Sequence, residues 1–178
     1  PAVVVVARRH HRDAFDAIAA RHDDALAALA TDADRAAVRA VLDARLGELS
    51  ELLDGVFLLR EATPRTRDAV VGMGERLSAP LVATAFRAAG HDAVALDATA
   101  FVRTDRQFGN ATVDLDATDA LVAAAFTALP AGQIAVVTGF VGATEAGVAT
   151  TLGRSGSDYT ATVLAGALGA RECVIWTD

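Results

Sequence analysis

Apolar residues in this chain gather in a few short continuous runs, which are separated by longer segments of mixed polarity. Runs of Val, Ile, Leu and Ala at residues 2–7, 93–96 and 134–137 are typical of strands that are buried on both faces of a parallel sheet. A fourth run leads to residues 176–178, where we expect the last strand to end. The pattern therefore predicts strands that are spread over the whole length of the chain.

The segments between these runs show the spacing of helices. Residues 8–30 and 32–59 repeat apolar positions every three or four residues, and residues 117–129 form an Ala-rich helix that Pro130 stops. A further helix ends at Gly90. Helices that alternate with short buried strands indicate an α/β fold, namely a three-layer α/β/α sandwich around a mainly parallel central sheet.

Glycines and a proline shape the expected structure of the middle of the chain. Gly72 and Gly74 are expected to precede a helix, and Pro80 is expected near its beginning, where proline is tolerated. Residues 99–114 are expected to form an extended excursion with a turn at Gly109.

The junction between Ala7 and Arg8 is unusual for a buried parallel strand. Such a strand normally passes through a short turn of Gly, Ser, Asn or Asp, whereas here it meets a run of arginine and histidine directly. We therefore expect a segment to be missing between these two residues. The alternative is a short loop made of the polar residues themselves.

Composition narrows the classes of function. The chain has 178 residues, enough for one domain with a core, and its net charge of −7 argues against a nucleic-acid partner. No apolar run approaches the roughly 20 residues that a membrane helix needs. The single cysteine, Cys173, excludes an internal disulfide and fits a cytoplasmic protein, and we expect it to be a small core residue in the last strand. All 16 basic residues are arginine.

A Gly-rich loop before a short helix is the strongest candidate for binding chemistry. Gly153 and Gly156 allow tight turns, and Ser157 or Asp158 could cap the following helix. Arg154 offers a planar fork that suits a carboxylate. The segment indicates an anion site at a helix N-terminus. The alternative is a capped helix with Arg154 in a surface salt bridge.

Two further positions are weaker candidates. Glu75 follows two glycines, and its carboxylate could hold a substrate ammonium group or merely favour a helix N-terminus. Thr177 and Asp178 end a strand, where ligands of open α/β sheets gather. The histidines lack partners at metal-ligand spacing, so we expect no metal site built from the protein alone, and no P-loop is present.

These motifs together resemble the aspartokinase branch of the amino-acid kinase family, over about residues 66–178. The resemblance rests on the segment GFVGATEAGVATTLGRSGSDYTA followed by VIWTD, and RDAVVGMGERLSA supports it independently. VRTDRQFGNATVD is similar to the corresponding segment of the lysine-sensitive single-function type. The family fold, a three-layer α/β/α sandwich, agrees with the order of elements above.

The resemblance implies phosphorylation of the side-chain carboxylate of L-aspartate by ATP with Mg²⁺, which yields 4-phospho-L-aspartate for lysine, threonine and methionine synthesis. It implies that Arg154 clamps the α-carboxylate of the substrate, and that Glu75 and Asp158 face its ammonium group. Ser157 would help to hold the substrate, and Phe140 would line its pocket. Arg154 and Asp158 are the catalytic residues in this reading.

The resemblance also implies a nucleotide site and an assembly. Gly139, Thr177 and Asp178 would contribute to nucleotide binding. Members of the family lead us to expect a homo-oligomer, a dimer or larger.

The chain departs from the family pattern in ways that bear on activity. Aspartokinases carry a phosphate-contacting lysine in an N-terminal motif and a second lysine after Trp-Thr-Asp, whereas this chain has no lysine at all. We expect residues 1–178 to be part of a catalytic domain, with segments missing before Pro1, between Ala7 and Arg8 and after Asp178, and without the regulatory ACT domains. Such a chain should bind aspartate weakly and catalyse little or no transfer.

Three other interpretations stay open. The first is a sibling kinase that acts on glutamate, N-acetylglutamate or UMP. The second is a non-catalytic regulatory or assembly protein built on a kinase remnant. The third is a part of a fused aspartokinase–homoserine dehydrogenase.

Overall fold

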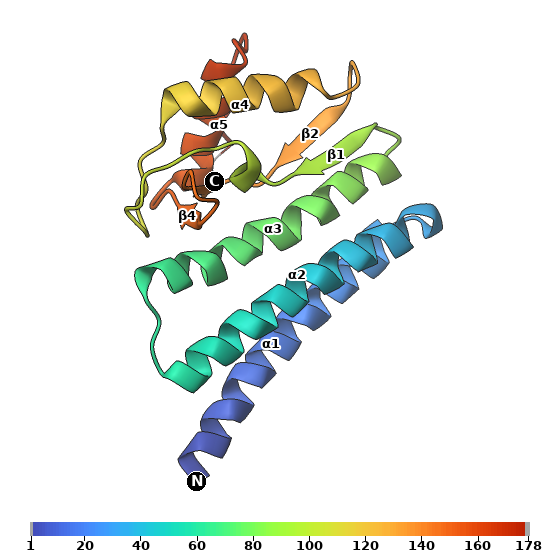
Figure 1. The fold of residues 1–178 in the computed structure, drawn as a ribbon. Helices are drawn as coiled ribbons and strands as arrows, with labels where there is room; N and C mark the ends of the chain where they lie inside the picture. The colour runs from blue at the N-terminus through green and yellow to red at the C-terminus, as the bar shows by residue number, and fades with distance from the viewer. Residues whose placement is uncertain (1, 177–178) are drawn as a thin grey trace.

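Three long helices form one side of the molecule in the computed structural model, which describes residues 2–176 and the side chains of residues 12–176. Helices α1 (Ala2–Leu29) and α2 (Asp32–Leu59) form a hairpin that packs along α3 (Pro64–Ala88) (Figure 1). Their shared core is made mainly of leucine, and both Leu42 and Met73 are fully buried in it.

Local chemistry explains where these helices begin. The first turn of α2 carries Asp32 and Asp34, whose negative charges suit the positive end of the helix dipole. The hydroxyl of Thr63 accepts a hydrogen bond from the Thr66 backbone N–H at 3.1 Å, and Pro64 occupies the first position of α3. The predicted helix over residues 32–59 is confirmed.

A parallel strand pair follows the long helices. Strands β1 (Ala93–Leu96) and β2 (Ile134–Val137) pair in register from Ala93 opposite Ile134 to Leu96 opposite Val137, which confirms two of the predicted strands. Between them lie the short 3₁₀ helix η1 (Ala98–Ala100) and helix α4 (Leu115–Thr127).

An antiparallel hairpin and a final helix complete the fold. Strands β3 (Val141–Ala143) and β4 (Ala149–Thr151) pair with each other, and α5 (Gly156–Ala167) follows. The excursion over residues 99–114 pairs with the β3–β4 hairpin through an isolated bridge between Arg103 and Ala143. It turns at Gly109, whose φ is +87°.

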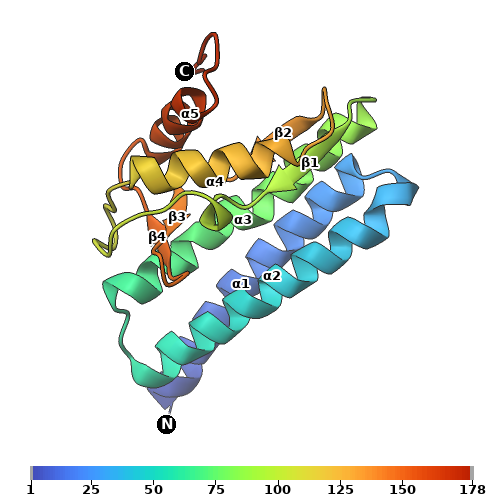
Figure 2. The same cartoon turned by 45° about the horizontal axis from the view of Figure 1, so that its top comes forward.

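Helices cover both faces of the strands. Figures 1 and 2 place α3 on one side of β1 and β2, and α4 on the other side with α5 next to it. The second core joins Val122 of α4 and Val163 of α5 to Val141 and Phe101. The predicted three-layer α/β/α arrangement is confirmed.

The predicted strand over residues 2–7 is wrong, because these residues belong to α1. A strand needs a neighbouring strand to bond its backbone N–H and C=O groups, whereas a helix satisfies them within one segment. Helix α1 runs without interruption through Ala7 and Arg8. A segment missing between these two residues stays a prediction.

The predicted helix start near Glu75 is also wrong, because Gly72, Gly74 and Pro80 all lie inside α3. Gly72 serves packing instead. A Cβ atom at this position would lie 3.0 Å from Cγ1 of Val141, so glycine lets α3 approach β3 closely.

The predicted last strand does not form over its described residues. Residues 170–176 have no strand structure, Cys173 is exposed rather than in the core, and Trp176 is 88% exposed. An apolar run becomes a strand only beside a partner edge, and this segment has no pairing within residues 2–176.

Candidate functional site

The carboxyl ends of β1 and β2 meet at one edge of the parallel pair. Asp97 follows β1, and Thr138 follows β2. The Thr138 hydroxyl accepts a hydrogen bond from the backbone N–H of Ala98 at 2.8 Å, which ties the two strand ends together. Ligands of open α/β sheets bind at such an edge, so the residues that follow β2 are candidates for ligand contacts.

Glu75 reaches this edge from the middle of α3. Its side chain is half-buried, and its carboxyl group interacts with the backbone of Gly139, the second residue after β2. Burial raises the pKa of Glu75, and the hydrogen bond from Gly139 offsets only part of that rise. A carboxylate held in this way is suited to a cationic ligand, which would restore the stability of its charged form.

Gly139 also touches the beginning of α5. A Cβ atom at Gly139 would lie 2.9 Å from both Cβ and Oγ of Ser157, so only glycine fits between the two segments. The structure therefore brings Glu75, Gly139 and Ser157 together. These residues come from three elements that are far apart in the chain.

Phe140 is held in an uncommon backbone conformation next to this point. Its φ is +66°, a region that disfavours residues with a side chain. The Phe140 N–H donates to Oγ1 of Thr160 at 3.0 Å, and its carbonyl accepts from the N–H of Leu152 at 2.9 Å. A Cβ atom at Gly156 would lie 2.7 Å from Cδ2 of Phe140, so the ring packs directly on the start of α5.

The loop before α5 carries the predicted anion ligand. Arg154 is exposed, and its side chain makes no ion pair or hydrogen bond within the described residues. The surface salt bridge considered for Arg154 is therefore absent from that part of the chain.

The predicted cap of α5 by Ser157 or Asp158 is wrong. Ser155 is the N-cap residue, with φ +55° and no side-chain cap bond, and both predicted residues lie within the first turn. Their side chains are exposed at the helix N-terminus, where unpaired N–H groups favour an anion. The predicted nucleotide residues Thr177 and Asp178 lie outside the described residues.

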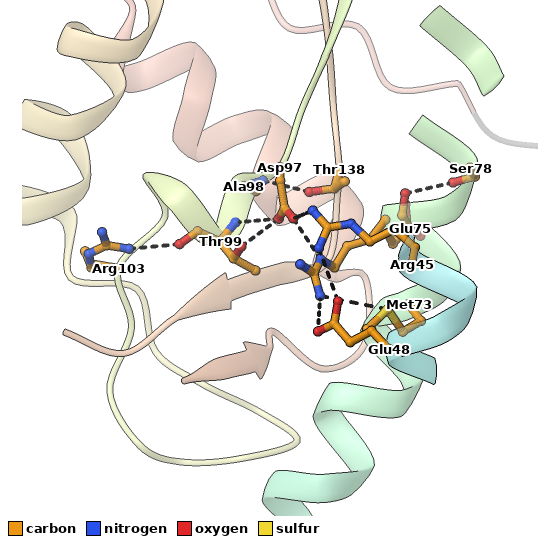
Figure 3. A network of polar contacts seen from close by, with 11 residues as sticks. Arg45, Glu48, Met73, Glu75, Ser78, Asp97, Ala98, Thr99, Arg103 and Thr138 are labelled. Atoms are coloured by element: carbon orange, nitrogen blue, oxygen red, sulfur yellow. Dashed lines mark hydrogen bonds and ion pairs between the residues drawn. The ribbon is translucent and has the colours of Figure 1, made fainter. Parts of the chain in front are cut away.

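Sequence reasoning missed a polar cluster beside Glu75. Asp97 accepts hydrogen bonds from Nε of Arg76 at 2.7 Å and from Arg45 at 3.2 Å, and Arg76 also contacts Glu48 at 3.1 Å (Figure 3). Burial alone would raise the pKa of Asp97, but hydrogen bonds from Thr99 and Arg76 outweigh it and lower the pKa. The place of Asp97 directly after a predicted strand is a signal that could have identified it.

Known proteins are similar to this chain in sequence over most of its length. A profile described as "Amino acid kinase family" matches residues 5–178. The chain belongs to the amino acid kinase family. It is 34% identical over 131 residues to the aspartokinase of Schizosaccharomyces pombe, covering 74% of this chain and 25% of that protein. It is 36% identical over 136 residues to lysine-sensitive aspartokinase 3 of Escherichia coli, covering 74% of this chain and 30% of that protein.

A solved structure of the family is similar over nearly the whole chain. The crystal structure of Escherichia coli aspartokinase III in complex with aspartate and ADP shares 32% identity with a TM-score of 0.85, covering 94% of this chain and 36% of that one. This likeness supports the three-layer fold. The chain spans about a quarter to a third of the length of the relatives that it matches.

The described residues of this amino acid kinase chain contain neither a cluster of metal ligands nor a membrane-spanning helix. Within the described residues, no group of three or more His, Cys, Asp or Glu side chains could hold a metal ion. None of the described helices is both long enough and apolar enough to span a membrane.

Proposed function

We propose that this chain forms the aspartate-binding part of an aspartokinase, which transfers the terminal phosphoryl group of ATP to the side-chain carboxylate of L-aspartate. The observation that carries the proposal is the contact of Glu75 with Gly139 and of Gly139 with Ser157. These contacts place the half-buried carboxylate of Glu75 near the N-terminus of α5. A zwitterionic amino acid needs this combination, an anion for its ammonium group and cationic or N–H donors for its carboxylates.

Each substrate group has a proposed partner. Glu75 and Asp158 face the ammonium group, and Arg154 binds the α-carboxylate through its planar fork. Ser157 helps to hold the substrate, and Phe140 lines its pocket. The unpaired state of Arg154 within the described residues supports this role, because no protein carboxylate competes for its guanidinium group. The similarity to the structure of Escherichia coli aspartokinase III in complex with aspartate and ADP supports aspartate as the acceptor and an adenine nucleotide as the second ligand.

The proposed chemistry depends on alignment. A side-chain carboxylate has a pKa of about 4 and is ionised at neutral pH, so it needs no general base. One of its oxygens bonds to the terminal phosphorus while the bond to ADP breaks, which gives 4-phospho-L-aspartate and ADP. Residues that hold the carboxylate in line with that bond accelerate the step.

Fewer of the described residues are proposed to contact the nucleotide than to contact aspartate. ATP, which enters with Mg²⁺, would supply the phosphoryl group, and Gly139 is its one proposed partner among the described residues. The chain has no lysine to neutralise the transferring group, so we expect weak or undetectable turnover by these 178 residues. We also propose that the protein forms a homo-oligomer and is located in the cytoplasm.

The first experiment measures binding of L-aspartate to the 178-residue chain by NMR or calorimetry, with L-glutamate as the competing acceptor. We expect L-aspartate to bind and L-glutamate to bind more weakly. Arg154→Met should reduce the affinity for L-aspartate about tenfold or more, since it removes a charged hydrogen-bond donor. Arg171→Met, at an exposed arginine beyond the other end of α5, is the matched control and should bind normally.

Each result has a clear reading. Equal affinity for the two amino acids would favour a sibling kinase of the same fold. Absence of binding to either one by a folded chain would overturn the proposal and favour a non-catalytic remnant. Aspartate-dependent ADP formation by the same chain would contradict the expectation of weak turnover and strengthen the assignment of the reaction.

A further inference from the structure

A buried aspartate that no motif analysis singled out lies two helical turns before Glu75. Asp68 in α3 is only 4% exposed. Its Oδ2 accepts hydrogen bonds from the backbone N–H groups of Gly109 and Thr151, each at 2.9 Å, and its Oδ1 accepts from the Thr151 hydroxyl at 2.9 Å. Three donors from two distant segments converge on one carboxylate, which is how a buried charge is satisfied without a cation.

The two segments that Asp68 joins surround the loop that carries Arg154. Thr151 ends β4, three residues before Arg154. Gly109 belongs to the turn of the excursion, and the side-chain oxygen of the next residue, Asn110, occupies the place where a Cβ of Gly153 would stand. The loop is therefore held at its base by Thr151 and on its flank by Asn110.

Helix α3 carries both Asp68 and Glu75, seven residues apart. Seven residues are close to two full turns, so both side chains leave the same face of the helix. Glu75 contacts Gly139, while Asp68 contacts Thr151. One rigid helix thus sets the distance between the two predicted ligands of the amino acid.

We propose that Asp68 is a positioning residue, which fixes the loop of residues 152–155 so that Arg154 stands at the correct distance from Glu75 to bind the α-carboxylate of the substrate. The part of this inference that concerns the substrate rests on the function proposed above. The part that concerns the loop does not, and it can be tested without any ligand.

The test without ligand is limited proteolysis by trypsin. Because the chain has no lysine, trypsin cleaves only after arginine, and cleavage after the exposed Arg154 reports on the order of its loop. Asp68→Ala should increase the rate of this cleavage about tenfold, as expected for loss of hydrogen bonds to a charged acceptor. Cleavage after Arg60, between α2 and α3, should stay unchanged and serves as the internal standard.

Two variants keep the test decisive. Asp68→Asn should restore most of the protection, because its amide oxygen can accept both N–H groups while its NH₂ group donates to the Thr151 hydroxyl. If Asp68→Ala does not fold, Thr151→Val removes one donor and should cause a smaller rise in the same cleavage. Asp119→Asn, at an exposed aspartate of α4, is the matched control and should behave as the original chain.

The test with ligand compares L-aspartate with β-alanine, which lacks the α-carboxylate. Arg154→Met and Asp68→Ala should each reduce the preference for L-aspartate, and the double variant should lose little more, since both changes act on one contact. The affinity for β-alanine should stay within about twofold of the original chain, because that ligand does not use Arg154.

The outcomes separate the two proposals. Unchanged cleavage after Arg154 in both Asp68→Ala and Thr151→Val would overturn the positioning role even if aspartate binds normally. Failure of the original chain to bind L-aspartate would overturn the proposed function and the substrate part of this inference, while the cleavage result would still decide the loop part. Fully additive losses in the double variant would show that Asp68 acts elsewhere than through Arg154.

Discussion

The helical hairpin of α1 and α2 and the α/β region that follows it are stabilised by different kinds of contact. Buried side chains of the hairpin are leucine, valine and alanine, centred on Leu42. In the described part of the chain, every buried polar side chain lies between residues 68 and 160. They are Asp68, Thr84, Thr104, Thr118, Thr138, Thr144, Thr150, Thr151 and Thr160.

This difference follows the location of the candidate site. Apolar contacts depend on buried area and tolerate small shifts, whereas hydrogen bonds fix distances and directions. Thr138 joins two strand ends, and Thr160 holds the strained backbone of Phe140. The region that contains the candidate site is thus the one that is held by directional bonds. The hairpin supplies a supporting surface for α3.

The largest expected effect breaks the hairpin core and leaves the site intact. Leu42 is fully buried, so its change to alanine should lower the free energy of unfolding by about 2–5 kcal/mol. Because none of the proposed ligands of L-aspartate lies on α2, the affinity of the folded fraction for L-aspartate should stay within about twofold. Urea unfolding and calorimetry measure the two quantities, and a parallel loss of affinity would contradict the division between the regions.

A glycine substitution at the site should have the opposite pattern. Gly139→Ala should cost about 1–3 kcal/mol, because its Cβ would overlap Ser157, and it should also abolish binding of L-aspartate. Gly55→Ala in α2 is the matched control. Nothing lies within 4 Å of its Cβ, so this change should stabilise the protein by about 0.5–1 kcal/mol. Normal binding of L-aspartate by Gly139→Ala would show that the contact between Gly139 and Ser157 is not part of the site.

The polar contacts of Asp97 should make the stability of the α/β region depend on pH. The pKa of Asp97 is lowered from an ordinary value of 3.8, so its stabilising effect is present above that value and is lost as the pH falls through the pKa of the folded state. At pH 7, Asp97→Asn should therefore cost about 2 kcal/mol, and the difference should shrink in acid. Unfolding curves at several pH values test this, with Asp13→Asn of α1 as control. A difference that does not depend on pH would be evidence against the ionic contact with Arg76.

The smallest expected effect on stability comes from Glu75→Gln. Burial raises the pKa of Glu75, so its protonated form stabilises the fold fully below the unfolded value, and this contribution is lost as the pH rises through the folded value. Glutamine, which cannot ionise, should raise the melting temperature slightly at pH 8 and leave it unchanged well below the unfolded pKa. The same change should abolish binding of L-aspartate. A lower melting temperature at pH 8 would show that the charge of Glu75 stabilises the fold.

Local patterns in the sequence were sufficient for most of the elements. Leucine spacing identified α2, and the short apolar runs identified β1 and β2, because each of these signals reflects the environment of consecutive residues. The same reasoning failed at residues 2–7 and at residues 170–176. An apolar run does not state whether a partner strand lies beside it, and that depends on segments far away in the chain.

The candidate site divides in the same way. Glu75, Phe140 and Arg154 were chosen from motifs, and the structure places Glu75 against Gly139 and Phe140 against the start of α5. Their roles toward a ligand stay predictions. Asp97 and Asp68 were not singled out, although Asp97 directly follows a predicted strand and Asp68 lies within the segment RDAVVGMGERLSA. Their hydrogen-bond partners come from distant segments of the chain, which the sequence alone does not show.

The sequence by itself determined the order of most elements, the family of the chain and the kinds of side chain that could hold an amino acid. Only the tertiary structure decided that α3 runs unbroken past Glu75, and that Asp68 on the same helix accepts hydrogen bonds from Gly109 and Thr151. The physical reason is the range of each effect. Helix propensity and hydrophobic period act over a few residues, whereas the hydrogen bonds of Asp68 join positions 41 and 83 residues apart.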